Sequence, residues 1–217
     1  MNILILVIAI TAIISFVAPN GSSNFEKYKF SVGAILNRKE YIRLLSSGFL
    51  HADLMHLVFN MLTLYFFGPV VIQGFGNLGF ILIYFGSIVL GNIFSLFVYQ
   101  KQPWYSAIGA SGGVSGILFA SIAMIPHLEI YMFFIPIGIP GYIFGLVYFS
   151  YSVYMMLNPS QHDNIGHAAH LGGAFFGLLY AVANQPQAAI ANSLYLGIMA
   201  LPLLYLSYEI FINKKIR

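Results

Sequence analysis

Two serines lie in adjacent Gly-x-Ser-Gly patterns within the apolar segment GASGGVSG, at Ser111 and Ser115. A serine hydroxyl becomes a nucleophile when a neighbouring base takes its proton, so either serine could form a covalent intermediate. The same segment suits packing, because glycines four residues apart allow two helices to approach closely. A serine within an apolar helix also commonly bonds only to its own helix. The pattern alone therefore leaves both readings open.

A histidine that could act as the base lies in the segment HAAHLGGAFFG. His167 and His170 are three residues apart and share one face of the predicted helix. The glycines that follow allow this helix to approach the serine segment. A neutral imidazole beside a serine hydroxyl can accept its proton, which makes His170 the candidate base. The structural alternative is a buried histidine bonded to a backbone carbonyl, and this is the favoured interpretation of His167.

The segment HADLMHLVFN places further polar side chains on a helix. His56 and Asn60 are one turn apart and share a face, whereas His51 is rotated away by about 140°. An imidazole and a side-chain amide aimed at one point can donate hydrogen bonds to an oxyanion. The alternative is a polar clamp between two helices.

Metal binding is a competing use of these histidines. The HExxH pattern is absent, and the nearest carboxylates, on Asp53 and Asp163, fall near the predicted membrane surface. The chain has no cysteine, which excludes thiolate chemistry. The sequence therefore predicts a Ser–His dyad that uses no metal and no cofactor and has no evident third member.

The elements that position these residues must be membrane helices. Of the 217 residues, 59% are hydrophobic and only 7% are charged, whereas soluble domains carry roughly 25% charged residues. The nine lysines and arginines are too few for a surface that follows nucleic-acid phosphates. Only helices and closed barrels satisfy their backbone in lipid, and no barrel pattern is present. We therefore expect an all-α polytopic bundle forming a single integral membrane domain over residues 1–217. The predicted helices are 2–19, 48–71, 77–99, 104–126, 130–157, 165–184 and 189–212.

Helix order predicts that the four candidate side chains meet in one layer. Helices 48–71, 104–126 and 165–184 begin at the same membrane face, because two crossings separate each from the next. Ser111 then lies roughly 10 Å and His170 roughly 8 Å below that face. His56 and Asn60 lie roughly 12 to 18 Å below it. Polar side chains are rare within spans and usually mark function.

In this order and at these depths, the motifs resemble the rhomboid family of intramembrane serine proteases. The resemblance covers about residues 40–184 and rests on GASG, AHLGG, HADLMHLVFN and the loop EYIRLLSSGFLH with its arginine at Arg43. It implies that Ser111, rather than Ser115, is the nucleophile and that His170 is the general base. It also implies an oxyanion hole formed by His56, Asn60 and the backbone N–H of Ser111.

The resemblance further implies an endopeptidase that cuts single-pass membrane proteins in or near their transmembrane segments. Its partners would be these substrates and the lipid bilayer, with no nucleic acid; the oligomeric state is left open. We expect a multi-pass protein of the cell membrane, plasma or inner. Helix 189–212 looks like a seventh helix added to a six-helix core. Two alternatives are a catalytically inactive relative that binds membrane clients and a histidine-lined transporter or metal channel.

Two features depart from the family pattern or conflict with it. An aromatic side chain commonly follows the nucleophile by one turn and stacks on the catalytic imidazole, and this chain has Ser115 there. The nine lysines and arginines all fall on the face where the active site would open. The positive-inside rule makes that face cytoplasmic, whereas the resemblance implies the opposite face. We favour the family orientation, on the expectation that the first loop holds its charges in its own fold.

Overall fold

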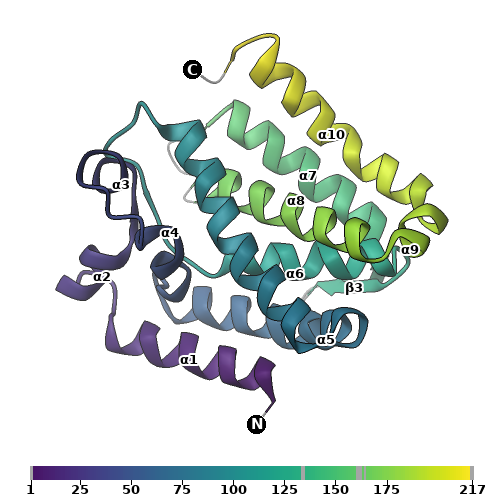
Figure 1. Ribbon diagram of the computed structural model, residues 1–217, viewed down its shortest axis with the longest axis horizontal. Helices are drawn as coiled ribbons and strands as arrows, with labels where there is room; N and C mark the ends of the chain where they lie inside the picture. The colour runs from purple at the N-terminus through teal and green to yellow at the C-terminus, as the bar shows by residue number, and fades with distance from the viewer. Residues whose placement is uncertain (1, 133–134, 160–162, 164, 216–217) are drawn as a thin grey trace.

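The computed structural model describes residues 2–132, 135–159, 163 and 165–215, and it is a helical bundle (Figure 1) with two small two-stranded antiparallel sheets. The predicted helical bundle is therefore confirmed. In chain order the elements are α1 (Ile3–Val17), α2 (Ser23–Tyr28), β1 (Phe30–Ser31), α3 (Val32–Arg38), α4 (Arg43–Ser46), the 3-10 helix η1 (Ser47–Phe49), α5 (Leu54–Tyr99), β2 (Ser106–Ala107), α6 (Ser111–Met124), β3 (Glu129–Met132), β4 (Ile135–Pro140), α7 (Gly141–Leu157), α8 (His167–Asn184), α9 (Pro186–Ala191) and α10 (Ser193–Phe211).

Helix α5 contains two of the predicted helices. It runs for 46 residues, and its backbone leaves the helical region at Gly76, with φ of 70° and ψ of 179°. Glycine adopts a positive φ readily because it has no Cβ. The arm before this break packs on α1, where Gly68 faces Leu4, and the arm after it packs on α8, where Gly91 faces the carbonyl of Ala169. The break at Gly76 therefore allows the two arms of α5 to pack against different helices.

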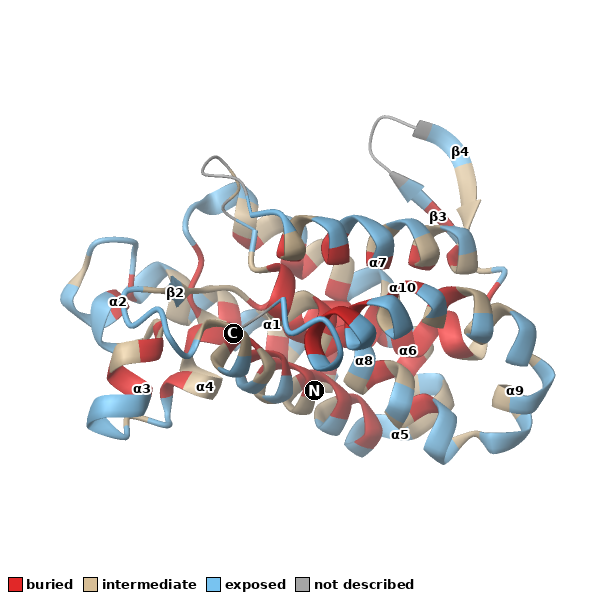
Figure 2. Cartoon of the chain, turned by 90° about the horizontal axis from the view of Figure 1, so that it is seen from above, coloured by how far each residue is buried: buried red, intermediate tan, exposed pale blue. Residues whose placement is uncertain are grey.

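The outer surface of the bundle is apolar. Figure 2 shows the buried residues concentrated where α5, α6 and α8 meet. Phe66, Leu78, Leu194 and Phe211 on the outside are between 64% and 70% exposed. Among the described residues, α5 and α10 are long and apolar enough to cross a membrane, and α1, α6 and α7 are shorter apolar helices. Large exposed apolar surfaces mark contact with lipid or protein, so this surface suits a bilayer.

Four of the predicted helices have different bounds, and the predicted helix 48–71 becomes α-helical only at Leu54. The predicted helix 104–126 becomes helical only at Ser111, because β2 first pairs with β1, and Gly109 then takes a φ of 117°. The predicted helix 130–157 becomes helical only at Gly141. Residues before it form the β3–β4 hairpin, in which Pro136 and Pro140 cannot donate helical hydrogen bonds. The predicted helix 189–212 is divided at Asn192 into α9 and α10.

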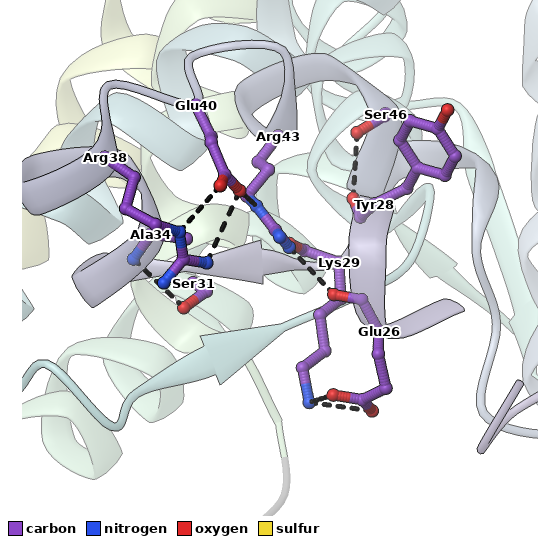
Figure 3. Close-up of polar contacts among 9 residues, drawn as sticks. All are labelled: Glu26, Tyr28, Lys29, Ser31, Ala34, Arg38, Glu40, Arg43 and Ser46. Carbon is purple, nitrogen blue, oxygen red and sulfur yellow. Dashed lines mark hydrogen bonds and ion pairs between the residues drawn. The ribbon is translucent and has the colours of Figure 1, made fainter. Parts of the chain in front are cut away.

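The long loop after α1 forms α2, β1, α3 and α4 and is folded around Arg43 (Figure 3). Arg43 is 5% exposed. Its Nε donates to Glu40 at 2.6 Å, and its terminal nitrogen donates to the carbonyls of Glu26 at 2.9 Å and Lys29 at 2.7 Å. These bonds tie α2 and the following turn to α4, directly before the chain enters α5.

Of the five lysines and arginines in this loop, three form ion pairs within it. Lys29 contacts Glu26, while Arg38 and Arg43 both contact Glu40. Hydrogen bonds from Arg38 and then Arg43 lower the pKa of Glu40 from 4.5 to about 2. Because the pKa is lowered in the folded chain, the stabilisation is complete above pH 4.5 and is lost as the pH falls through about 2. The loop therefore keeps its ion pairs at neutral pH.

Replacing Arg43 with alanine is expected to destabilise the protein by about 2 kcal/mol, because the carbonyls of Glu26 and Lys29 lose a buried donor. The measurement is thermal unfolding of purified protein in detergent. Arg38→Ala is the matched control, since Arg38 makes an exposed ion pair with the same carboxylate and should change the melting temperature little. Equal shifts in melting temperature for the two variants would contradict the role of Arg43 in holding α2 and the following turn to α4.

Candidate active site

Ser111 and His170 meet at the first turns of two neighbouring helices. Ser111 is the first residue of α6, and His170 is the fourth residue of α8. The hydroxyl Oγ lies 2.6 Å from His170 Nε2. Both side chains are only partly buried. With Nε2 accepting the hydroxyl proton, the neutral ring carries its own proton on Nδ1. This geometry suits removal of the serine proton by the imidazole.

Glycines bring the two helices into backbone contact. A Cβ added to Gly173 of α8 would lie 2.1 Å from the carbonyl oxygen of Gly112, and one added to Gly177 would lie 2.0 Å from that of Gly116. No side chain fits in that space. The small residues therefore serve packing, and this packing also presses Ser111 of α6 toward α8.

Replacing Gly177 with alanine is expected to destabilise the bundle by about 1 to 3 kcal/mol, because the new methyl group overlaps the α6 backbone. Gly197→Ala is the matched control: it also lies in a helix, and nothing lies within 4 Å of its added Cβ. That control should unfold at the same temperature or a higher one. Thermal unfolding in detergent measures both, and an unshifted Gly177→Ala would contradict the backbone contact.

His56 lies beside the serine. Asp53 caps α5 by accepting from the backbone N–H of His56 at 2.8 Å. His56 Nδ1 accepts from the backbone N–H of Ala52 at 3.4 Å, so the neutral ring carries its proton on Nε2. A Cβ on Gly109 would lie 2.8 Å from this Nε2 and 3.6 Å from Ser111 Oγ. An N–H donor therefore faces the backbone directly before the serine.

Asn60 follows His56 by one turn and is buried, with 7% of its surface exposed. Its Nδ2 donates to the carbonyl oxygen of His56 at 2.9 Å. A side-chain amide has a second N–H, which this bond does not use. This bond holds the Asn60 side chain against the backbone of His56, one turn before it on α5.

His51 contacts the backbone that precedes the serine, which the sequence did not indicate. It was expected to turn away from the site, but α5 begins only at Leu54, so helical periodicity does not apply to it. Its Nδ1 lies 2.7 Å from Ser15 Oγ of α1, and its Nε2 accepts from the backbone N–H of Ala110 at 3.3 Å. Its ring packs edge-on against His56, with centroids 4.9 Å apart. His51 therefore connects α1 with the backbone that precedes the serine.

The carboxylate of Asp163 is paired with His167, the other histidine at the start of α8. Asp163 Oδ2 lies 2.8 Å from Nε2 of His167, and both side chains are largely buried. His167 also packs edge-on against Tyr151, with centroids 5.5 Å apart. Among the described residues, no group of three or more histidine, aspartate or glutamate side chains could hold a metal ion.

Tyr148 of α7 is the second residue that sequence reasoning missed. Its ring faces His170 with an interplanar angle of 18° and centroids 6.3 Å apart. Its hydroxyl lies 2.8 Å from Ser115 Oγ. A polar–apolar pattern on one helix could not indicate this contact, because the two partners lie on α6 and α8.

Known proteins resemble this chain in sequence. A family model described as the rhomboid domain matches residues 38–186. The chain is 31% identical over 165 residues to Rhomboid protein 1, mitochondrial, of Saccharomyces cerevisiae, which covers 70% of this chain and 46% of the relative. It is 30% identical over 147 residues to RHOMBOID-like protein 12, mitochondrial, of Arabidopsis thaliana, covering 60% and 43%. It is 32% identical over 162 residues to Rhomboid protease GluP of Bacillus subtilis, covering 72% and 30%. The matches span less than half of each relative's length.

Proposed function

We propose, from the premise that the chain belongs to the rhomboid family, that this integral membrane protein is an intramembrane serine endopeptidase. The observation that carries the proposal is the 2.6 Å contact between Ser111 Oγ and His170 Nε2. A serine paired with a neutral imidazole in this way can form and hydrolyse an acyl-enzyme. The bacterial relative, Rhomboid protease GluP, is named as a protease, and this supports the same reaction class.

The proposed reaction has two halves. His170 Nε2 takes the proton of Ser111 while Oγ attacks the carbonyl carbon of the scissile peptide bond. The protonated imidazole then gives its proton to the leaving amine, and the C–N bond breaks. In the second half His170 takes a proton from water, the hydroxide attacks the ester, and the proton returns to Ser111. No metal or cofactor takes part in either half.

The developing oxyanion would be bound by three donors. His56 presents its Nε2–H beside Gly109, and Asn60 carries an amide one turn further along α5. Ser111 is the first residue of α6, where a backbone N–H has no acceptor within its own helix. The positive end of the helix dipole adds to the attraction for a negative oxygen. Together these groups form the proposed oxyanion hole.

Replacing Asn60 with alanine is expected to lower kcat about 10²- to 10³-fold, or about 3 to 4 kcal/mol, because one oxyanion donor is lost. Thr63→Val is the matched control, since Thr63 lies one turn further on α5 and its exposed hydroxyl donates to the carbonyl one turn before it. Turnover of a membrane substrate in liposomes measures both variants. An Asn60→Ala enzyme with unchanged kcat would remove Asn60 from the oxyanion hole.

The proposed substrates are single-pass membrane proteins, cut in or near their transmembrane segment. Ser111 and His170 lie at the first turns of α6 and α8, so they are close to one end of the bundle and partly exposed. Water and an unwound substrate backbone can reach such a position more easily than the middle of a span. The surrounding apolar surface would hold the substrate helix in lipid beside the bundle.

We further propose a multi-pass arrangement in which α10 is a seventh span. The relatives named above include mitochondrial and bacterial proteins, so they give no support to the plasma membrane in particular. Three of the five cations of the first loop are paired with its carboxylates, which weakens the positive-inside argument for a cytoplasmic active-site face. We therefore keep the orientation in which the active site opens away from the cytoplasmic or matrix side.

The experiment that tests the proposed function is cleavage of a single-pass substrate by purified protein in liposomes, with and without a chelator. The account predicts a cut in or near the transmembrane segment at an unchanged rate in chelator. Loss of activity in chelator would revive a metal-handling function. Folded protein that binds several substrates and cuts none would instead support an inactive, client-binding relative.

A further inference from the structure

Ser115 of α6 is bonded to a side chain from another helix. It is 5% exposed, and its Oγ lies 2.8 Å from the hydroxyl oxygen of Tyr148 of α7. Ser121, less than two turns further along α6, bonds backbone carbonyls, that of Ile117 in its own helix at 2.9 Å and that of Phe67 at 3.4 Å. Ser115 instead fixes the outer end of a tyrosine ring.

The ring of Tyr148 is held on its other sides by aromatic neighbours. Its centroid lies 5.3 Å from that of Phe119, 5.8 Å from Phe144 and 6.1 Å from Phe149. These separations are within the range of interacting aromatic pairs. With its hydroxyl bonded and its ring surrounded, Tyr148 has little freedom to change rotamer.

The fixed ring faces the imidazole of His170. The two planes are only 18° from parallel, and their centroids are 6.3 Å apart, near the outer limit for an aromatic pair. His167 approaches the imidazole from another direction, with centroids 6.4 Å apart and planes at 65°. The hydrogen bond to Ser111 aims Nε2, but rotation of the ring about that direction is still possible. A flat neighbour parallel to the imidazole limits this rotation.

We propose that Tyr148 is a positioning residue for His170, anchored through its hydroxyl to Ser115; the inference rests on the proposed serine-protease function. Ser111 and Ser115 are one turn apart on α6, so the helix that carries the nucleophile also carries the anchor. Ser111 contacts His170, and His170 faces Tyr148. Tyr148 in turn bonds Ser115, which lies on the same helix as Ser111. Three helices are thereby held in register at the proton-transfer step.

The contact between Tyr148 and His170 compensates for the missing aromatic residue at Ser115. The position one turn after the nucleophile holds no aromatic ring of its own. Tyr148 supplies a ring from α7, and the small serine leaves room for its hydroxyl. The second Gly-x-Ser-Gly pattern thus has a use of its own, because Ser115 orients the general base through Tyr148 and does not compete with Ser111 as a nucleophile.

The test compares kcat and KM of variants in the liposome assay. Tyr148→Leu removes the ring and is expected to lower kcat about 10- to 100-fold, because a misplaced base costs about that much, with KM changed less than about twofold. Tyr148→Phe keeps the ring and loses only the anchor, so its kcat should lie between that of Tyr148→Leu and wild type. Tyr154→Leu is the matched control: it lies on the same helix, is 62% exposed and should leave both constants unchanged.

The anchor is tested by a double-mutant cycle. Ser115→Ala should lower kcat as much as Tyr148→Phe does, and the double variant should be no slower than either single variant, because all three lack the same hydrogen bond. Additive losses would overturn the anchor. These small changes keep the proposal testable if Tyr148→Leu does not fold.

The failure of this inference can be told apart from failure of the proposed function. Active wild-type protein together with an unchanged kcat in folded Tyr148→Leu would overturn the inference alone. A change confined to KM would do the same, since it would place Tyr148 in substrate binding. Folded wild-type protein that cuts no substrate would overturn the proposed function and, with it, a role for Tyr148 in that reaction.

Discussion

Ser111→Ala is expected to abolish cleavage in liposomes, with turnover falling at least about 10⁴-fold below wild type. The reason is that the hydroxyl forms the acyl-enzyme, and no other described hydroxyl lies against His170 Nε2 at 2.6 Å. The change removes one oxygen atom at the start of α6 and leaves the glycine contacts between α6 and α8 in place. Cleavage is measured as the appearance of the cut substrate over time.

The matched control for this prediction is Ser121→Ala. Ser121 is a buried serine of the same helix whose hydroxyl bonds the backbone carbonyl of Ile117. It should retain the wild-type rate. Ser115→Ala should keep measurable activity, because the loss expected there concerns only the orientation of the base. Full activity of Ser111→Ala, in a preparation freed of other proteases, would remove Ser111 as the nucleophile.

His170→Ala is expected to cause a loss of similar size, because Ser111 is then left without a base. Residues of a catalytic unit do not act additively, so the Ser111→Ala/His170→Ala double variant should be no slower than either single variant. His127→Ala is the matched control. His127 lies after α6, at the other end of that helix from the serine, and packs against Tyr142 and Tyr195.

The result that would contradict the role of His170 is specific. Activity retained in folded His170→Ala would show that the imidazole is not the base. A loss equally large in His127→Ala would show that histidine replacement unfolds the protein in general. Thermal unfolding of each variant separates that outcome from a loss of chemistry.

Much of the arrangement could be predicted because it depends on local spacing. Glycines at four-residue intervals predict a close helix contact, and the structure has the α6 and α8 backbones touching at Gly112 and Gly173. Helix order places Ser111 and His170 at the same end of the bundle. His56 and Asn60 fall on one helix because Asp53 caps α5 directly before them.

Contacts that depend on tertiary packing could not be predicted. His51 lies before the start of α5, so its contact with Ala110 follows from the path of the loop and not from helical periodicity. Tyr148 was one of many aromatic residues on an apolar helix. Only the approach of α7 to both α6 and α8 shows that this one faces His170.

The predicted bounds of the helices were wrong where turns and strands lie within apolar segments. Hydrophobicity extended the predicted helix 130–157 across residues that form the β3–β4 hairpin, although Pro136 and Pro140 indicated an irregular start. In the same way, the apolar residues before Ser111 concealed the positive φ of Gly109. The nucleophile therefore lies at the beginning of α6 and not seven residues inside it.

The most direct test of the central claim is covalent labelling of the proposed nucleophile. Purified protein would be treated with a fluorophosphonate, which reacts with activated serines, and the modified residue would be identified by peptide mass spectrometry. The account predicts a phosphonyl group on Ser111 in the wild type and none there in His170→Ala. Modification of Ser115 instead, or equal labelling of Ser111 with and without His170, would contradict the Ser111–His170 dyad.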